Sequence, residues 1–430
     1  MKRIIGTFIL PVALAALTSC VSTSPAFVRV ENGHFVNTDE YFAGANLWYG
    51  AILASECESG DRQRLVRELD TLKSIGVTNL RVLVGGDGPD GLPCHIFPTL
   101  QKEPGVYNEK IFEGLDYLLY EMGKRQMKAV LYLNNSWEWS GGYGMYLEWA
   151  GCGKALIPAE AGYLPYTEEM SKFSTCENAK ELFYNHIRTV VSRTNTVTGK
   201  PYSEDPAIFA WQICNEPRCF SSDPEVRHAF AGWLKTSAAL IKSIDSNHMV
   251  STGSEGYYGC EADYGLFEEI HSCPDIDYLT VHIWPYNWSW VTKDRLYDGL
   301  PDVISATDEY LDGHLAIAEK YRKPVVIEEF GYPRDGGSFE KTSSVSARDE
   351  YYRHILGRLK TSADEGGLLA GINFWAWGGF AAQSTDHTDW REGDDYCGDP
   401  AQEPQGLYSV YASDTSTIEL IKSVAETIAK

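Results

Sequence analysis

The chain has 430 residues, 43% hydrophobic and 13% aromatic, a composition that excludes a disordered protein and provides for a large buried core. Its 37 basic and 60 acidic residues give a net charge of −23, which argues against nucleic acid as a partner because phosphates are bound by clustered positive charge. The 12 Trp and 26 Tyr residues are mostly expected in the core, but some are candidates for flat platforms that bind sugars or bases.

The N-terminus has the pattern of an export signal. Lys2 and Arg3 precede an apolar run over 4–17, which is too short to span a membrane as a stable helix. The run ends in Leu-Thr-Ser-Cys, which resembles the bacterial lipobox, after which Cys20 is lipidated and becomes the new N-terminus. A plain signal peptide cut nearby is the alternative.

These features predict three segments along the chain. They are a lipoprotein signal peptide (1–19), the lipidated cysteine with a polar tether (20–26), and a single domain (27–430). No other apolar run reaches 18 residues, so the N-terminal lipid is the only expected membrane attachment. The expected location is the envelope of a Gram-negative bacterium, at the outer membrane or cell surface.

Eight short apolar runs, rich in β-branched and aromatic residues, are typical of strands buried on both faces. In chain order they cover 42–48, 78–84, 127–133, 208–214, 249–253, 278–284, 324–330 and 371–377. The preceding segment, 27–41, is predicted to be a hairpin that plugs the bottom of the domain.

Amphipathic helices are predicted between these strands. In the first of them, 61–75, Asp61 is a candidate N-cap and Gly76 a stop signal. The others cover 109–125, 179–194, 224–244, 311–322 and 348–361. Eight alternations of strand and helix without a linker predict an α/β fold, a (β/α)8 TIM barrel.

The ten cysteines predict an oxidising location without fixing the disulfides. Lipidation of Cys20 leaves nine, so at least one thiol should be free. Plausible pairs are Cys57–Cys94, Cys152–Cys176 and Cys260–Cys273. No CxxC or HExxH motif is present, so no metal site is predicted. The acidic stretch 386–395 is interpreted as a solvated loop, with weak calcium binding as the alternative.

Polar groups follow the predicted strands at the end where a TIM barrel carries its chemistry. They are Arg81, Asn134, Asn135, Asn215, Glu216, His282, Trp284, Glu328, Glu329, Trp375 and Trp377. Glu216 and Glu329 could converge as the acid and the nucleophile of glycoside hydrolysis. Without further motifs, the two glutamates are explained equally well as partners in structural ion pairs with Arg218 and Arg81.

Longer motifs resemble glycoside hydrolase family five, and within it the endo-β-1,4-mannanases. WQICNEPR places Asn-Glu-Pro after a strand, and IEEFG follows a later strand. The subgroup is indicated by PGVYNEKIFEGLDYLLYEMGKRQMKAVLYLNN, WEWSGGYGMYLEWA, SRTNTVTGKPYSEDPAIFAWQICNEPR, VHIWPYNW and EPQGLYSVYASD. The resemblance covers nearly all of residues 27–425.

The resemblance implies that Glu216 is the general acid/base and that Glu329, which precedes Phe330-Gly331, is the nucleophile. Strand alternation agrees that only one of the adjacent glutamates 328 and 329 faces the barrel mouth. Asn215 would bind the sugar C2 hydroxyl and Arg81 would keep the nucleophile ionised.

Further roles follow from the same resemblance. His282 would orient the acid/base or the sugar, with a core histidine as the alternative, and Trp375 would be the platform beneath the sugar, while Trp377 packs in the core. Either Trp48 or Tyr49 would contact sugar, and Trp137 would line a subsite or pack at the rim. At the sixth strand the family often has His-x-Tyr, in which the tyrosine hydroxyl hydrogen-bonds the nucleophile. This chain has Trp284 at that position, whose indole N–H can donate but not accept, so Tyr286 is an alternative source of the hydroxyl.

The expected activity is retaining, endo-acting hydrolysis of mannan, glucomannan or galactomannan by a monomer without a cofactor. The loops that close the cleft decide between endo and exo action, so both modes stay open. A β-1,4-glucanase with the same glutamate pair is one alternative function. A non-catalytic glycan-binding lipoprotein is the other.

Overall fold

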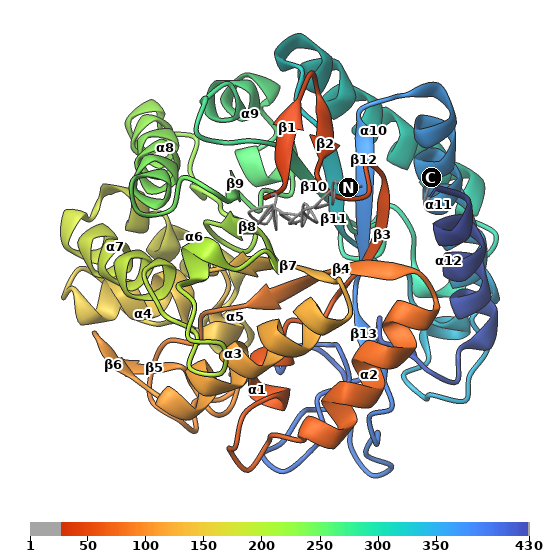
Figure 1. The fold of residues 1–430 in the computed structure, drawn as a ribbon, viewed down its shortest axis with the longest axis horizontal. Helices are drawn as coiled ribbons and strands as arrows, with labels where there is room; N and C mark the ends of the chain where they lie inside the picture. The colour runs from red at the N-terminus through yellow and green to blue at the C-terminus, as the bar shows by residue number, and fades with distance from the viewer. Residues whose placement is uncertain (1–26, 429–430) are drawn as a thin grey trace, which may run out of the picture.

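Eight parallel strands form the centre of the molecule in the computed structural model, which describes residues 27–428 (Figure 1). They are β3 (Phe42–Asn46), β4 (Val77–Leu83), β7 (Lys128–Tyr132), β8 (Ile208–Gln212), β9 (Met249–Ser251), β10 (Leu279–Ile283), β11 (Val325–Phe330) and β12 (Leu369–Phe374). Neighbours follow the order β10-β11-β12-β3-β4-β7-β8-β9. All eight predicted strands are confirmed, and nearly every residue in them is buried.

The sheet closes into a barrel between β9 and β10, where loop residues replace a regular strand ladder. Asp277 donates its backbone N–H to Val250 O at 2.8 Å, and its side chain accepts from Val250 N at 2.7 Å. Further along β10, His282 N donates to Glu255 O at 3.0 Å. These bonds complete the predicted (β/α)8 TIM barrel.

An antiparallel hairpin of β1 (Arg29–Glu31) and β2 (His34–Val36) covers the bottom of the barrel, as predicted. Its buried Phe35 packs against Phe42, Phe209 and Tyr278 with ring centroids 5.1–6.1 Å apart. Because these three rings lie at or just before the N-terminal ends of their strands, the hairpin seals the end opposite the strand carboxyl ends.

Helices surround the strands (Figure 1). They are α2 (Arg62–Ser74), α3 (Glu109–Lys124), α7 (Glu177–Val191), α8 (Pro224–Ile244), α9 (Tyr264–His271), α10 (Leu300–Tyr321), α11 (Ser346–Glu365) and α12 (Thr415–Ile428). Asp61 caps α2 by accepting from Arg64 N at 2.8 Å, and Gly76 beyond its end has φ +81°. Helix α10 begins at Leu300 rather than at 311, with a proline in its first turn. None of the described helices is long and apolar enough to cross a membrane.

Smaller elements gather on the loops that follow the strands. They are α1 (Gly50–Leu53), β5 (Gln101–Glu103), β6 (Val106–Tyr107), α4 (Gly142–Trp149), α5 (Pro158–Ala161), α6 (Tyr163–Met170), β13 (Trp377–Gly379) and β14 (Val410–Tyr411). The acidic stretch 386–395 lies in the loop between β13 and β14, is mostly exposed as expected, and pairs charges internally, for example His387 with Asp394 at 2.8 Å.

One disulfide is present in the described part of the chain, Cys152–Cys176, one of the three pairs that the spacing suggested. The pairs Cys57–Cys94 and Cys260–Cys273 are not formed, and the remaining described cysteines are free thiols. The predicted signal peptide, the lipidated Cys20 and the tether lie outside the described residues.

Candidate active site

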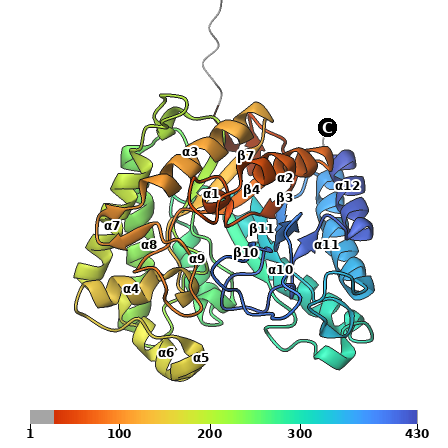
Figure 2. The same cartoon turned by 90° about the horizontal axis from the view of Figure 1, so that it is seen from below.

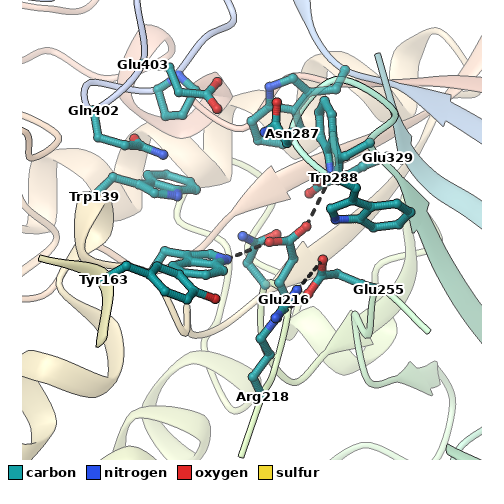
Figure 3. Close-up of a pocket in the computed structure, with 15 residues that line it drawn as sticks. Trp139, Tyr163, Glu216, Arg218, Glu255, Asn287, Trp288, Glu329, Gln402 and Glu403 are labelled. Atoms are coloured by element: carbon teal, nitrogen blue, oxygen red, sulfur yellow. Dashed lines mark hydrogen bonds and ion pairs between the residues drawn. The ribbon is translucent and has the colours of Figure 1, made fainter. Parts of the chain in front are cut away.

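A pocket of about 380 Å³ opens at the carboxyl ends of the barrel strands (Figure 3). It is lined by Trp137, Trp139, Tyr163, Asn215, Glu216, Arg218, Glu255, Trp284, Asn287, Trp288, Glu329, Trp375, Pro400, Gln402 and Glu403. Three kinds of group meet there: carboxylates, hydrogen-bonding side chains and flat aromatic rings. That mixture is typical of a site for a neutral, hydroxyl-rich ligand.

Glu216 lies just beyond β8 in a left-handed backbone conformation, with φ 48°. Its backbone N–H donates to Gly253 O at 3.0 Å, which holds this uncommon conformation in place. Its carboxylate accepts from Trp137 Nε1 at 2.6 Å and Trp284 Nε1 at 3.2 Å, and lies 2.9 Å from His282 Nδ1. Three ring N–H groups therefore fix one buried carboxylate at the pocket floor.

Glu329, on β11, is 2% exposed and pairs with Arg81 from β4. The guanidinium also donates to Asn215 Oδ1 at 2.8 Å and to Gln212 Oε1 at 2.7 Å, and it stacks 4.3 Å over the Tyr132 ring. Because Arg81 is fully buried and its donors are occupied, it supplies a fixed positive charge beside Glu329.

The two carboxylates are close enough to act on one bond. An oxygen of Glu216, an oxygen of Glu329 and a ring nitrogen of His282 all lie within 4.8 Å of one another. Retaining glycosidases separate their carboxyl groups by about 5–5.5 Å, whereas inverting enzymes need about 6.5–9.5 Å to admit a water. The spacing here matches the retaining arrangement.

His282 links the pair, since its Nδ1 is also 3.2 Å from Glu329 Oε2. Burial acts to lower the pKa of this imidazole, but the charge of Glu329 and hydrogen bonds with both glutamates outweigh it and raise the pKa to about 9. His282 is therefore a cation that holds the two carboxylates in place at neutral pH.

The same three side chains could offer ligand atoms to a metal ion. The Arg81 guanidinium already occupies Glu329, however, and two indole N–H groups occupy Glu216. A bound cation would have to displace these donors and lie beside a buried guanidinium. The donor set therefore favours proton transfer and nucleophilic attack over metal binding.

Glu328 takes no part in lining the pocket. It is buried deeper in the barrel, where it accepts from Tyr278 Oη at 3.0 Å and from Gln212, and burial raises its pKa. The register between β10 and β11 shifts so that His282 stands beside Glu329 rather than Glu328. Only the second of the two adjacent glutamates lines the pocket.

Comparison with known proteins identifies the family. The model of GH family 5 beta-mannosidase-like proteins matches residues 25–430. The chain belongs to glycoside hydrolase family 5.

Relatives in this family are similar over most of their length. Mannan endo-1,4-beta-mannosidase 1 of Arabidopsis thaliana is 31% identical over 388 residues, covering 86% of each chain. Mannan endo-1,4-beta-mannosidase 1 of Oryza sativa is 33% identical over 366 residues, which are 81% of this chain and 78% of the rice protein. The solved structure of the family 5 mannosidase from Rhizomucor miehei superposes with a TM-score of 0.85 at 34% identity, covering 94% of this chain and 98% of that one.

In this family 5 glycoside hydrolase, the aromatic residues after β12 separate as the sequence predicted. Trp375 lines the pocket and meets Trp284 edge-on with centroids 6.0 Å apart. Trp377 is fully buried and donates to Glu68 at 2.8 Å. The indole of Trp284 donates to Glu216 rather than to Glu329, and Tyr286 does not line the pocket.

The prediction that Trp48 or Tyr49 contacts sugar is wrong. Trp48 is 1% exposed and donates to Gly398 O at 2.6 Å, and the buried Tyr49 donates to Trp377 O at 2.7 Å. Because both polar atoms point to backbone carbonyls inside the fold, neither ring reaches the pocket. Trp139 lines the pocket instead, with Trp48 packed behind it at 5.3 Å.

Loops supply the pocket residues that the sequence did not indicate. They are Trp139, Tyr163, Glu255, Asn287, Trp288, Pro400, Gln402 and Glu403. Arg218, considered above as a partner for Glu216, forms a bidentate pair with Glu255 instead, with one N–O distance of 2.8 Å. Motifs quoted above contain some of these residues, for instance Trp139 and Glu403, but no periodic pattern marks them as pocket residues.

Proposed function

We propose that this enzyme hydrolyses β-1,4-mannosidic bonds in mannan, glucomannan or galactomannan by a retaining double displacement, cutting within the chain. The observation that carries the proposal is the buried pair Glu216–Glu329 within 4.8 Å, with a fixed guanidinium on Glu329. The names of the relatives in Arabidopsis and rice support the mannan substrate and the endo mode.

Each glutamate has a distinct part in this mechanism. Glu329, kept ionised by Arg81, attacks the anomeric carbon and forms a covalent mannosyl–enzyme ester. Glu216 donates its proton to the glycosidic oxygen as the C–O bond breaks. A water deprotonated by Glu216 then attacks the anomeric carbon, releases Glu329 and gives a product with retained configuration.

The neighbouring groups position sugar and carboxylates. Asn215 accepts from Arg81 through Oδ1 and donates one amide N–H to Asn135 Oδ1 at 3.1 Å, so its other N–H is free to bind the sugar C2 hydroxyl in the pocket. His282 holds both carboxylates, and Trp375 presents a ring face to the apolar face of the sugar.

One observation favours a second mode, the release of short units from a chain end. Gln402 and Glu403, from the loop between β13 and β14, form a polar wall of the same pocket (Figure 3). A wall of this kind limits the length of polysaccharide that can pass through the site. The similarity to a structure described as a mannosidase is in keeping with this mode.

Product analysis tests the proposal. Incubation with unbranched mannan should release oligosaccharides of mixed length from the start, and carboxymethylcellulose should be hydrolysed far more slowly. Accumulation of one short product from the outset would establish the exo mode. Faster action on the cellulose derivative would support a glucanase, and no hydrolysis of either polymer would support a non-catalytic glycan-binding protein.

We propose in addition that the mature protein is a monomer held at the cell envelope by a lipid on Cys20. The lipid anchor is supported by the N-terminal sequence, with its basic start, apolar run and lipobox-like tetrad. Mass spectrometry of the membrane fraction should find the lipid on Cys20, and Cys20→Ala should move the enzyme to the soluble fraction. Recovery of unmodified wild-type protein from the soluble fraction would contradict the proposal.

A further inference from the structure

The short helices α5 and α6 project from the rest of the molecule (Figure 2), and α6 contributes a residue to the pocket lining. Helix α5 buries none of its side chains, and α6 buries only Tyr166 and Met170. Tyr166 donates its hydroxyl to Ser136 O at 2.5 Å and stacks on Trp137, with centroids 6.0 Å apart. So few buried groups give this segment little packing energy to hold it in place.

The disulfide compensates for this thin packing. Cys152 lies just beyond α4, and Cys176 is the residue before α7, so the bond joins both ends of the projecting segment. It closes a loop with a sequence separation of 24 residues that contains both short helices. A covalent tie across a loop of this length reduces the conformations that the loop can adopt.

The first residue of α6, Tyr163, lines the pocket and yet is 53% exposed. Burial raises the pKa of its phenol, and the charges that act on it most strongly are those of Arg218, Glu255, Glu261 and Glu216. Tyr163 and the proposed proton donor Glu216 line the same pocket. In the close-up, Tyr163 and Trp288 lie on opposite sides of Glu216 and Arg218 (Figure 3).

We propose that Tyr163 is a specificity-determining residue that stacks on the sugar of the leaving group, and that the Cys152–Cys176 disulfide positions it for this contact. The inference rests on the proposed hydrolysis and names the part of the substrate that the projecting segment binds. The leaving-group sugar lies next to the acid that protonates it, which is where the exposed phenol ring is available.

Stacking of this kind affects long and short substrates differently. A mannooligosaccharide places sugar units beside Tyr163, whereas a β-mannosyl fluoride has a single-atom leaving group that cannot reach the ring. Loss of the ring should therefore raise KM for the oligosaccharide while turnover of the fluoride stays the same.

The test compares Tyr163→Ala with Leu164→Ala on mannohexaose and β-mannosyl fluoride. Leu164 is the matched control because it adjoins Tyr163, is 71% exposed and does not line the pocket. Tyr163→Ala should raise KM for mannohexaose about tenfold, Tyr163→Phe should restore it, and Leu164→Ala should change it less than about twofold. The double variant Cys152→Ser/Cys176→Ser should raise KM for mannohexaose in the same direction, again without loss on the fluoride.

Equal KM values for Tyr163→Ala and Leu164→Ala would overturn the role of Tyr163. Equal losses on both substrates would overturn it as well, because they would show a general disturbance of the site. An unchanged KM in the cysteine variant would remove the disulfide from the proposal. If wild-type enzyme hydrolysed neither substrate, the proposed function itself would fail, a result distinct from all three.

Discussion

Glu216 follows β8 and Glu329 lies on β11, three strands further round the barrel, yet both contact the same atom, Nδ1 of His282, at 2.9 and 3.2 Å. The imidazole is fully buried, and its pKa is raised to about 9 by the two carboxylates against the effect of burial. The distance between the acid and the nucleophile is therefore held by a charge that depends on pH.

Replacing this histidine should make stability less sensitive to alkaline pH. The folded-state pKa of about 9 lies above the unfolded value of 6.5, so the contribution is full below about pH 6.5 and is lost as pH rises through 9. Chemical denaturation should show wild type more stable than His282→Gln by on the order of 3 kcal/mol at pH 6, with the difference shrinking towards pH 9.5. A gap of constant size across this range would contradict the prediction; the exposed His228→Gln is the control.

Rescue of activity by azide should distinguish the acid/base Glu216 from the nucleophile Glu329. Glu329→Ala should lose on the order of 10⁴-fold or more in kcat on every substrate, because no covalent ester can form. Glu216→Ala should lose much less on a substrate with an activated leaving group that needs no proton, and azide should restore turnover by giving a β-mannosyl azide of retained configuration. The exposed Glu319→Ala on α10 should behave as wild type. Nuclear magnetic resonance of the products reads the configuration, and an α-azide from the Glu216 variant would rule out the assignment.

Arg81 should be intolerant of a conservative change. Its guanidinium contacts Glu329, Asn215 and Gln212 at once, and a lysine ammonium cannot reproduce that planar fork. Arg81→Lys should lower kcat at least about 100-fold and reduce the free energy of unfolding by about 3 kcal/mol, since it leaves buried acceptors without donors. Steady-state kinetics and urea titration measure both effects. Near-native kcat in a folded Arg81→Lys protein would show that the fixed charge is dispensable.

Substitution of Trp48 should affect stability alone, whereas substitution of Trp139 should affect substrate binding. Trp48→Phe removes the bond to Gly398 O in the core and should cost about 1 kcal/mol of stability while leaving KM unchanged. Trp139→Ala removes a ring from the pocket wall and should raise KM several-fold. Thermal unfolding and steady-state kinetics of the two variants test whether Trp139, and not Trp48, contacts the substrate. A KM effect in Trp48→Phe alone would return that residue to the substrate site.

The barrel was predictable because its strands are buried on both faces and carry uninterrupted apolar runs. An apolar run does not predict the orientation of Trp48 and Tyr49. A position just after β3 is compatible with a ring that points into the pocket and with one that packs behind the pocket wall. Helix α10 extends to Leu300, eleven residues before the predicted start at 311, and the segment 300–310 contains a proline and several polar and β-branched residues that favour helix less strongly.

The carboxylate pair was predictable from motifs and the loop residues were not. Glu329 lies on β11 and Glu216 shortly after β8, so the strands largely determine where the two side chains lie. Tyr163 and Glu403 enter the pocket from long loops whose paths depend on a disulfide and on β13–β14 pairing, and neither leaves a periodic signal in the sequence.

The ion pair of Arg81 and Glu329 joins residues 248 positions apart. An incompletely folded chain cannot form this ion pair, since the guanidinium reaches its partner only when β4 and β11 belong to the same closed barrel. Hydrolysis is consequently an all-or-nothing property of the finished fold. A molecule truncated before β11 would retain the buried Arg81 cation without Glu328 and Glu329, the two carboxylates nearest to it.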